Sequence, residues 1–277
     1  MRRAGHLAML LAVAGLACRA NEPASVAWID SHDPRPPGQA GPGSPNGVHA
    51  AEIAARVLEA MGGREAWEAV HHLHWRFFGI RETWWNRRSG DVRIETAGLV
   101  VLVNVTTRTG RAFRAGQEIT DPGELAATLA RACEWFANDS YWVIMPFTLL
   151  DPGVALAYLG PARLSDGREC DVLRVSPADG PAPRYDVSVA RDTGLVEEWS
   201  YYRTPDQTEP DFTLPWAGWQ RFGGVLLATD HGLKHDWDLA APPEVAEELY
   251  REVAEELYRQ PAEELYRQAA QDPDRRP

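Results

Sequence analysis

Basic residues are scarce in this sequence relative to acidic ones. The 28 Lys and Arg stand against 40 Asp and Glu, which leaves a formal net charge of −12 at pH 7. The phosphates of a nucleic acid would repel such a chain, and so would an anionic membrane surface. The composition therefore argues against a nucleic-acid partner, and any membrane contact has to be anchored or apolar.

Motifs that would identify an enzyme are also scarce. The sequence has no glycine-rich phosphate loop and no nucleophile elbow. The clusters HHLH (71–74) and HGLKH (231–235) contain zinc-binding residue types, but no Cys or carboxylate spacing completes a known ligand set. We interpret these histidines as exposed or singly hydrogen-bonded, and a metal-assisted hydrolase stays only as a third alternative. We predict no catalytic residues, no metal and no cofactor, and therefore a protein that is not an enzyme.

Long apolar runs are few, and the first lies at the N-terminus. Two arginines precede an apolar stretch, residues 7–17, that is too short to span a bilayer and is typical of an export signal. A small residue precedes Cys18, as in the bacterial lipobox, where the Cys becomes lipidated, although Gly15 stands where Leu is usual. Cleavage after Ala20 is the alternative. We predict that residues 1–18 are a signal peptide with a lipobox and that the chain is exported to the periplasmic side of the envelope.

Cysteine is rare as well, at three residues. If Cys18 carries lipid, Cys133 and Cys170 remain as a pair. An oxidising compartment permits a disulfide between them. Two unpaired buried thiols fit the sequence equally well, because the spacing does not decide between the alternatives.

The organisation of the chain changes near residue 47. Residues 19–46 contain six prolines and no apolar periodicity, which predicts an extended, disordered tether. The following residues, 47–241, have the pattern of one folded domain. An apolar stripe at helical spacing predicts a first helix that ends at Gly62 and Gly63, and a shorter helical piece follows.

The rest of this domain alternates between apolar and polar residues. Turn signals such as RSGD and RTGR separate short segments that we predict to be antiparallel strands. These strands are 73–82, 91–97, 99–107, 169–176, 184–190, 195–203, 216–223 and 224–234. One helix, beginning at Asp121, interrupts them. We predict an α+β fold with a large curved antiparallel sheet, because many strands tend to curl around their apolar face. This incomplete β-barrel of roughly nine to eleven strands would carry an N-terminal helix and an inserted helix-plus-loop lid.

The segment NDSYWVIMPFTLLDPG, residues 138–153, is apolar yet contains a central proline. A proline there excludes a central strand and an unbroken helix. We predict that the Asn-Asp-Ser triplet ends the preceding helix and that Pro146 holds Met145 in an extended conformation. Trp142, Met145 and Phe147 should point inward over the concave sheet face. The segment is then either a lid over a pocket or a plug that fills the core.

Four features together resemble a known family. They are LEAMGGREAWEAV, the strand start LHWRFFG, the inserted helix with its apolar lid, and WAGWQRFGGVLLAT. The pattern over residues 48–240 resembles the periplasmic lipoprotein-sorting carriers and acceptors of the LolA/LolB-like type. This resemblance implies an incomplete barrel capped by helices, with a hydrophobic cavity for acyl chains. Arg76 and Arg81 are both candidates for the carriers' cavity arginine. Arg19 after the lipidated Cys implies sorting to the outer membrane.

These inferences lead to a functional prediction. The chain should be a lipid-anchored, non-enzymatic binder of acyl chains or lipoproteins. The alternative is an envelope lipoprotein scaffold or sensor that binds protein partners and has a filled core. The predicted cavity and lid residues are Trp75, Phe77, Val101, Val103, Trp142, Met145, Phe147, Tyr185, Trp199 and Tyr201.

Residues 242–277 form a tail with an internal repeat. The units VAEELYRE, VAEELYRQ and PAEELYRQ follow one another from Val245. Each unit places Glu four residues before Arg, which favours a helix, and Pro261 should kink it. The apolar stripe recurs every four residues and rotates around the helix, so a straight coiled coil is not expected. We predict a solvated acidic helix, with a partner-binding role as the alternative.

Overall fold

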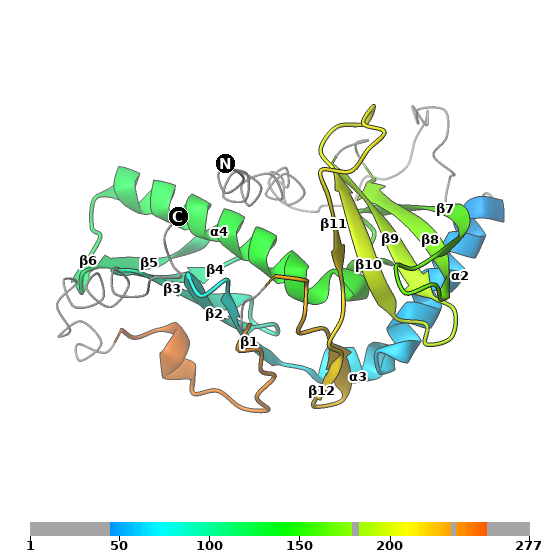
Figure 1. Ribbon diagram of the computed structural model, residues 1–277. Coiled ribbons are helices and arrows are strands. Elements are labelled where there is room, and N and C mark those ends of the chain that lie inside the picture. Colours follow the sequence, from blue (N-terminus) through cyan, green and yellow to red (C-terminus); the bar gives the residue numbers. More distant parts are fainter. Residues whose placement is uncertain (1–44, 179–182, 234–236, 254–277) are drawn as a thin grey trace, which may run out of the picture.

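The structure is a computed structural model, and it describes residues 45–178, 183–233 and 237–253 (Figure 1). Two helices open the described chain, α2 (Pro45–Ala60) and α3 (Gly63–Ala69). The predicted apolar stripe of the first helix is buried. The predicted signal peptide, with Cys18, and most of the predicted tether lie outside the described residues.

The turn between α2 and α3 requires glycine. Gly62 has a φ of +120°, and a Cβ on it would lie 2.4 Å from the carbonyl oxygen of Gly224. A side chain at this position would therefore clash with backbone that cannot move easily. The prediction that the first helix ends here is confirmed.

A six-stranded antiparallel sheet follows, in which each strand pairs with the next in the sequence. Its strands are β1 (His72–Phe77), β2 (Arg81–Asn86), β3 (Asp91–Thr96), β4 (Leu99–Asn104), β5 (Thr109–Arg114) and β6 (Gln117–Glu118). The single strand predicted over residues 73–82 is in fact the β1–β2 hairpin. Phe78 and Gly79 have positive φ angles and reverse the chain, so that Phe77 pairs with Arg81.

A five-stranded antiparallel sheet has the order β11-β10-β9-β8-β7. Its strands are β7 (Val154–Arg163), β8 (Glu169–Pro177), β9 (Arg184–Ala190), β10 (Val196–Tyr202) and β11 (Phe212–Pro215). A two-stranded ribbon, β12 (Gln220–Phe222) and β13 (Val225–Leu227), completes the described strands. The predicted antiparallel α+β fold is confirmed, with its strands divided among separate sheets that do not close into a barrel (Figure 1).

The inserted helix α4 (Pro122–Ile144) lies between the two large sheets in sequence and crosses one face of the first sheet (Figure 1). Its predicted start is confirmed, because the Asp121 carboxylate accepts the backbone N–H of Glu124 at 2.8 Å. A 3₁₀ turn, η2 (Met145–Thr148), follows α4 directly.

The predicted end of α4 at the Asn-Asp-Ser triplet is wrong. Asn138, Asp139 and Ser140 are buried within the helix. The Asp139 carboxylate accepts hydrogen bonds from Arg81 and from the Asn138 amide, so it has partners other than the helix backbone. A polar side chain with such partners does not compete for backbone hydrogen bonds, and the helix continues.

The predicted extended conformation of Met145 is also wrong. Met145 has φ −46° and ψ −44°, which is right-handed helical geometry. Pro146 lies in the first turn of η2, where its missing N–H removes no hydrogen bond that the turn requires. The segment is not a strand, as predicted, but its first half is regular helix.

The C-terminal part of the described chain returns to the first sheet. Ala240 forms a β-bridge with His74, and η3 (Glu247–Tyr250) lies on the face opposite α4 (Figure 1). The predicted Glu247–Arg251 ion pair is present at 3.0 Å. The α-helix predicted for the first repeat is wrong, since the described part of the tail forms only this 3₁₀ turn. Residues from 254 onward lie outside the described residues.

Cys133 of α4 and Cys170 of β8 are not joined by a disulfide. Cys170 lies in a small cluster with Leu164 and Ala190, whereas Cys133 packs beside the second cluster of the first sheet. The alternative of two thiols is therefore the observed one. Among the described residues, no helix combines the length and hydropathy needed to cross a membrane.

Candidate functional site

An aromatic cluster lies where the C-terminal end of α4 meets both large sheets. We define this aromatic cluster as Phe77, Trp142, Tyr185, Trp199, Trp216, His231 and Trp237, all of which are at most 2% exposed. Trp142 is at its centre, with ring centroids 4.8 Å from Trp199 and 5.9 Å from His231. Both pairs are edge-to-face, an arrangement that aromatic rings favour. The rings are thus in direct contact with one another.

The strands position these rings by simple alternation. Tyr185 lies opposite Tyr201, and Trp199 lies opposite Val187, in the β9–β10 register. Because alternate residues face one side of a sheet, this register turns the aromatic side chains toward α4. The rings of Tyr185 and Trp199 stack at 5.1 Å. Phe77 joins them from the other sheet, with its ring 6.2 Å from that of Trp142.

The end of α4 and η2 together cover this cluster. We call residues 138–148 the α4–η2 cover. Trp142, Met145 and Phe147, which were predicted to point inward, are all buried. Phe147 stacks on Trp67 of α3 at 4.0 Å, and this stack fixes the far end of the cover.

The structure brings most of the predicted cavity residues together. One continuous core contains Trp75, Phe77, Trp142, Met145, Phe147, Tyr185, Trp199 and Tyr201. Val101 and Val103 are not among them. They belong to a second cluster, where the N-terminal half of α4 packs through Leu129 and Ala132.

Three members of the aromatic cluster were not predicted: Trp216, His231 and Trp237. His231 lies 4.5 Å from the ring of Trp216 and 4.9 Å from that of Trp237. The interpretation of the HGLKH histidines as exposed or singly hydrogen-bonded is wrong for His231, because its ring is buried among indoles and its nitrogens have no partner among the described residues. The high tryptophan content, 11 residues, was the signal in the sequence that could have indicated such a cluster.

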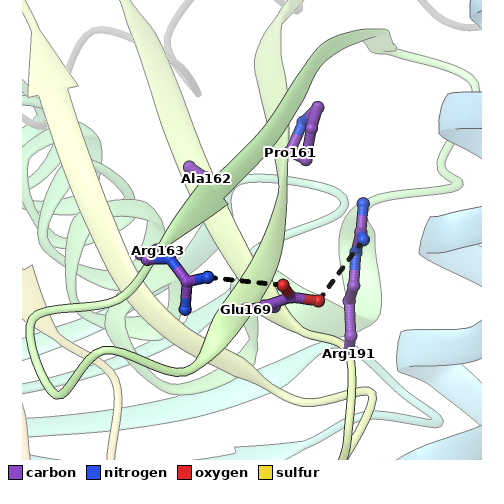
Figure 2. Close-up of a pocket in the computed structure, with 5 residues that line it drawn as sticks. All are labelled: Pro161, Ala162, Arg163, Glu169 and Arg191. Carbon is purple, nitrogen blue, oxygen red and sulfur yellow. Dashed lines mark ion pairs between the residues drawn. The ribbon is translucent and has the colours of Figure 1, made fainter.

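Two hollows in the described part of the chain lie away from the aromatic cluster. One, of about 250 Å³, is lined by Pro161, Ala162, Arg163, Glu169 and Arg191 (Figure 2). The Glu169 carboxylate lies between the two arginines there, at 3.5 and 3.8 Å (Figure 2). The second, of about 360 Å³, lies between β4, β5 and Tyr250. Neither is lined by a residue of the aromatic cluster, whose rings fill the space beneath the cover.

The aromatic cluster contains several polar atoms without a hydrogen-bond partner. The indole nitrogens of Trp142, Trp199, Trp216 and Trp237 are buried and have no hydrogen-bond partner among the described residues. The same holds for both ring nitrogens of His231. Buried polar groups in folded proteins are normally paired, so this concentration of exceptions in one place needs a reason.

Burial also controls the ionisation of this region. Desolvation lowers the pKa of His231 to about 4, with only a small opposing effect of Asp230. The imidazole is therefore neutral at pH 7 and has one donor and one acceptor nitrogen. Burial raises the pKa of the Tyr185 and Tyr141 hydroxyls, so both remain protonated donors.

A buried ion pair ties the α4–η2 cover to the first sheet. Nε and Nη2 of Arg81 donate to the two carboxylate oxygens of Asp139, at 2.7 and 2.8 Å. The Arg81 guanidinium also lies 4.9 Å from the centre of the Phe77 ring. Arg76, the other candidate for a cavity arginine, is 44% exposed in its side chain and pairs with Glu82. Only Arg81 lies beside the aromatic cluster.

The histidines of β1 lie on the opposite face of the sheet. His74 hydrogen-bonds to Glu82 at 3.0 Å, and this contact is the main reason that the pKa of Glu82 is lowered to about 2. His72 hydrogen-bonds to the Tyr250 hydroxyl at 3.0 Å. Within residues 45–178, 183–233 and 237–253, no group of three His, Cys, Asp or Glu side chains is arranged to hold a metal ion.

Comparison with known proteins gives structural likenesses at low sequence identity. No family model and no curated protein matches the chain. A DUF1329 family protein from Desulfovibrio piger has a TM-score of 0.39 and 13% identity, over 73% of this chain and 96% of that one. An outer membrane lipoprotein-sorting protein domain from Vibrio parahaemolyticus, the kind of protein that the sequence pattern resembles, has a TM-score of 0.38 and 8% identity, over 77% and 99%. MucB has a TM-score of 0.26 and 20% identity, over 78% and 66%.

Proposed function

We propose that the chain is an exported, lipid-anchored envelope protein that binds acyl chains of a lipid or lipoprotein within the aromatic cluster, without catalysing a reaction. The N-terminal sequence supports export and an anchor at Cys18. The composition of the cluster supports the class of ligand. An acyl chain would exchange ring contacts for chain contacts at little loss of apolar burial.

The unpartnered indole N–H groups carry this proposal. Trp142, Trp199, Trp216 and Trp237 each bury one, and such a group costs roughly 1–3 kcal/mol. If the cluster served only stability, Phe or Leu at some of these positions would make the protein more stable, because neither has a side-chain N–H to leave unpaired. The ester or amide carbonyl of an acylated molecule would accept hydrogen bonds from the same N–H groups. The bound ligand would then remove the free-energy cost of the unpaired indole N–H groups, which the free protein has.

Uptake requires the α4–η2 cover to move, because the rings beneath it are in contact. The hinge would lie at the junction of the α-helix with the 3₁₀ turn, at Met145 and Pro146, since the hydrogen-bonding pattern changes there. Methionine adapts its shape to a changed neighbourhood. The stack of Phe147 on Trp67 is the contact that must open. The Arg81–Asp139 ion pair would hold the α4 part of the cover in place while η2 moves.

Native mass spectrometry of the full-length protein purified from membranes tests the proposal. We expect bound lipid or acylated peptide in repeated preparations, and uptake of a fluorescent fatty acid by protein from which lipid has been removed. Protein that carries no lipid and takes up no fatty acid would rule the proposal out.

Matched variants of α4 test the role of the indole N–H. Trp142→Phe keeps an aromatic ring and removes the N–H, and it should weaken binding of a monoacylglycerol more than binding of a hydrocarbon of the same chain length. Trp135→Phe, on the same helix beside the second cluster, should change the affinity for neither the monoacylglycerol nor the hydrocarbon. Equal losses for both ligands would mean that the indole N–H does not contact the carbonyl.

A second candidate function is a scaffold or sensor that binds a protein partner. The close packing of the aromatic rings favours it, because the ring of Trp142 is in contact with those of Trp199 and His231. Removing residues 254–277 should then abolish capture of a partner while leaving the described domain folded. If the shortened chain keeps every interaction of the full chain, the tail is not a scaffold.

A further inference from the structure

The outer face of the six-stranded sheet is covered by the first copy of the tail repeat. We define the Arg93 surface as His72, Arg93, Val100, Leu102 and Phe113, which lie on β1, β3, β4 and β5. The described chain from Glu247 to Val253 lies against this surface, on the side opposite α4 (Figure 1).

Arg93 is the centre of this contact. Its side chain is only 2% exposed, although it lies on the outer face of the sheet. Its Nη1 donates to the carbonyl oxygens of Leu249, at 3.1 Å, and Glu252, at 2.8 Å. Its Nε pairs with Glu95. Arg93 thus binds the backbone of the repeat, and a buried guanidinium without these carbonyls would be poorly satisfied.

Two side chains of the tail complete the contact. Tyr250 is 8% exposed, and its hydroxyl hydrogen-bonds to Nδ1 of His72 at 3.0 Å. Val253 packs against the apolar group formed by Val100, Leu102 and Phe113. The surface therefore contacts a tyrosine and, three residues later, an apolar residue.

The other two copies supply the same features. Tyr258 precedes Pro261, and Tyr266 precedes Ala269, each by three residues, as Tyr250 precedes Val253. Arg93 contacts main-chain carbonyl oxygens, so these contacts do not depend on which side chains the docked segment has. The chain thus contains three segments with a tyrosine followed three residues later by an apolar residue, which is the pattern that the Arg93 surface contacts.

We propose that the Arg93 surface is a docking site for this short acidic Leu-Tyr-Arg segment, and that the second copy, residues 253–260, can replace the first copy on it. The described chain ends on the surface at Val253, so the second copy is attached directly beside its binding site. Such tethering gives a high effective concentration, which favours a segment of the same chain over one from another molecule. The hollow of about 360 Å³ beside Tyr250 and Arg251 leaves room next to the docked copy. This inference does not depend on acyl-chain binding.

Full-length variants test this exchange with a fluorescent VAEELYRQP peptide, residues 253–261, as the probe, because it contains both Tyr258 and Pro261. The wild type should bind the peptide weakly, because its surface is occupied. Tyr250→Ala should also bind weakly, because the second copy takes the place of the first. The triple variant Tyr250→Ala, Tyr258→Ala, Tyr266→Ala should bind the peptide at least about tenfold more tightly than Tyr250→Ala does, as no competing copy remains. Light scattering should show that Tyr250→Ala is monomeric.

Each control isolates one element of the contact. The peptide VAEELARQP should not bind the triple variant. Adding Arg93→Lys to the triple variant should abolish peptide binding, whereas adding Arg114→Lys, on β5 and two strands away from Arg93, should not. If the triple Tyr→Ala variant does not fold, the corresponding triple Tyr→Phe variant removes only the hydroxyls and should give a smaller gain in the same direction.

Three outcomes would overturn the proposal. Equal peptide binding by Tyr250→Ala and the triple variant would mean that, within the chain, the surface binds the first copy alone. Absence of peptide binding by a folded triple variant would mean that the repeat is not recognised as a segment. A mass for Tyr250→Ala that rises with concentration would mean that the occupant comes from a second molecule.

Discussion

Replacing His231 by Leu should remove a specific loss of stability in acid. His231 is 1% exposed, and neither of its ring nitrogens has a partner in the part of the chain that the structure describes. Burial lowers its pKa to about 4 in the folded protein, against about 6.5 in the unfolded chain. Between these two values the unfolded chain binds a proton that the folded protein does not bind. The free energy of unfolding therefore falls as the pH drops from 6.5 to 4.

The size of this effect follows from the two pKa values. Relative to pH 7.5, His231 should lower the free energy of unfolding by about 1.4 kcal/mol at pH 5.5 and by about 3 kcal/mol at pH 4. Urea denaturation of wild type and His231→Leu at these three pH values measures it. The wild type should lose that much more stability than the variant does. Parallel losses in wild type and His231→Leu would refute the burial of a neutral imidazole in the aromatic cluster.

Further changes test the cover, the inserted helix and the tail. Phe147→Ala should lower the free energy of unfolding by about 3–5 kcal/mol in urea titration, because the ring is buried and stacked. Leu150 is 37% exposed, so Leu150→Ala should lower the free energy of unfolding much less. If the large loss for Phe147→Ala comes with unaltered fatty-acid binding, the segment is a plug and not a lid. Asp121→Ala should cost about 1 kcal/mol in thermal unfolding, since the carboxylate caps α4, and an unchanged melting temperature would contradict the cap. Removing residues 245–277 should lower the melting temperature more than removing 254–277, because only the longer deletion uncovers Arg93; equal melting temperatures would show that the first copy adds no stability.

Several features of the fold could be predicted because they depend on neighbours in the sequence. The buried face of α2 follows from apolar residues at helical spacing, and the start of α4 follows from Asp121 before Pro122. The strands β8, β9 and β10 follow from alternation and from turn signals between them. Strands β5 and β7 were missed, because sequences such as TGRAFR and VALAYLGPAR do not alternate clearly.

The candidate site could be predicted only in part. The aromatic and methionine side chains of the cover and of β1, β9 and β10 were identified, because large apolar residues on predicted strands must be buried somewhere. Val101 and Val103 fit the same pattern but lie in the second cluster, since the faces of different strands look alike in sequence. His231 was missed as a core residue because a histidine is expected to be exposed or hydrogen-bonded, and its neighbours in the sequence do not show that its ring is buried.

The sequence by itself determined the antiparallel α+β class, the two N-terminal helices, the cap of α4 and the tail repeat, since each depends on residues within a few positions of one another. The tertiary structure decided how the strands divide between sheets, how far α4 extends, and where the first repeat lies. Arg81 lies 58 positions from Asp139, and Arg93 lies 156 positions from Leu249. Local rules treat Asp139 as a helix-ending residue and Arg93 as a solvated one. Partners distant in sequence reverse both assignments, because a buried charge is stable only where the fold brings it a partner.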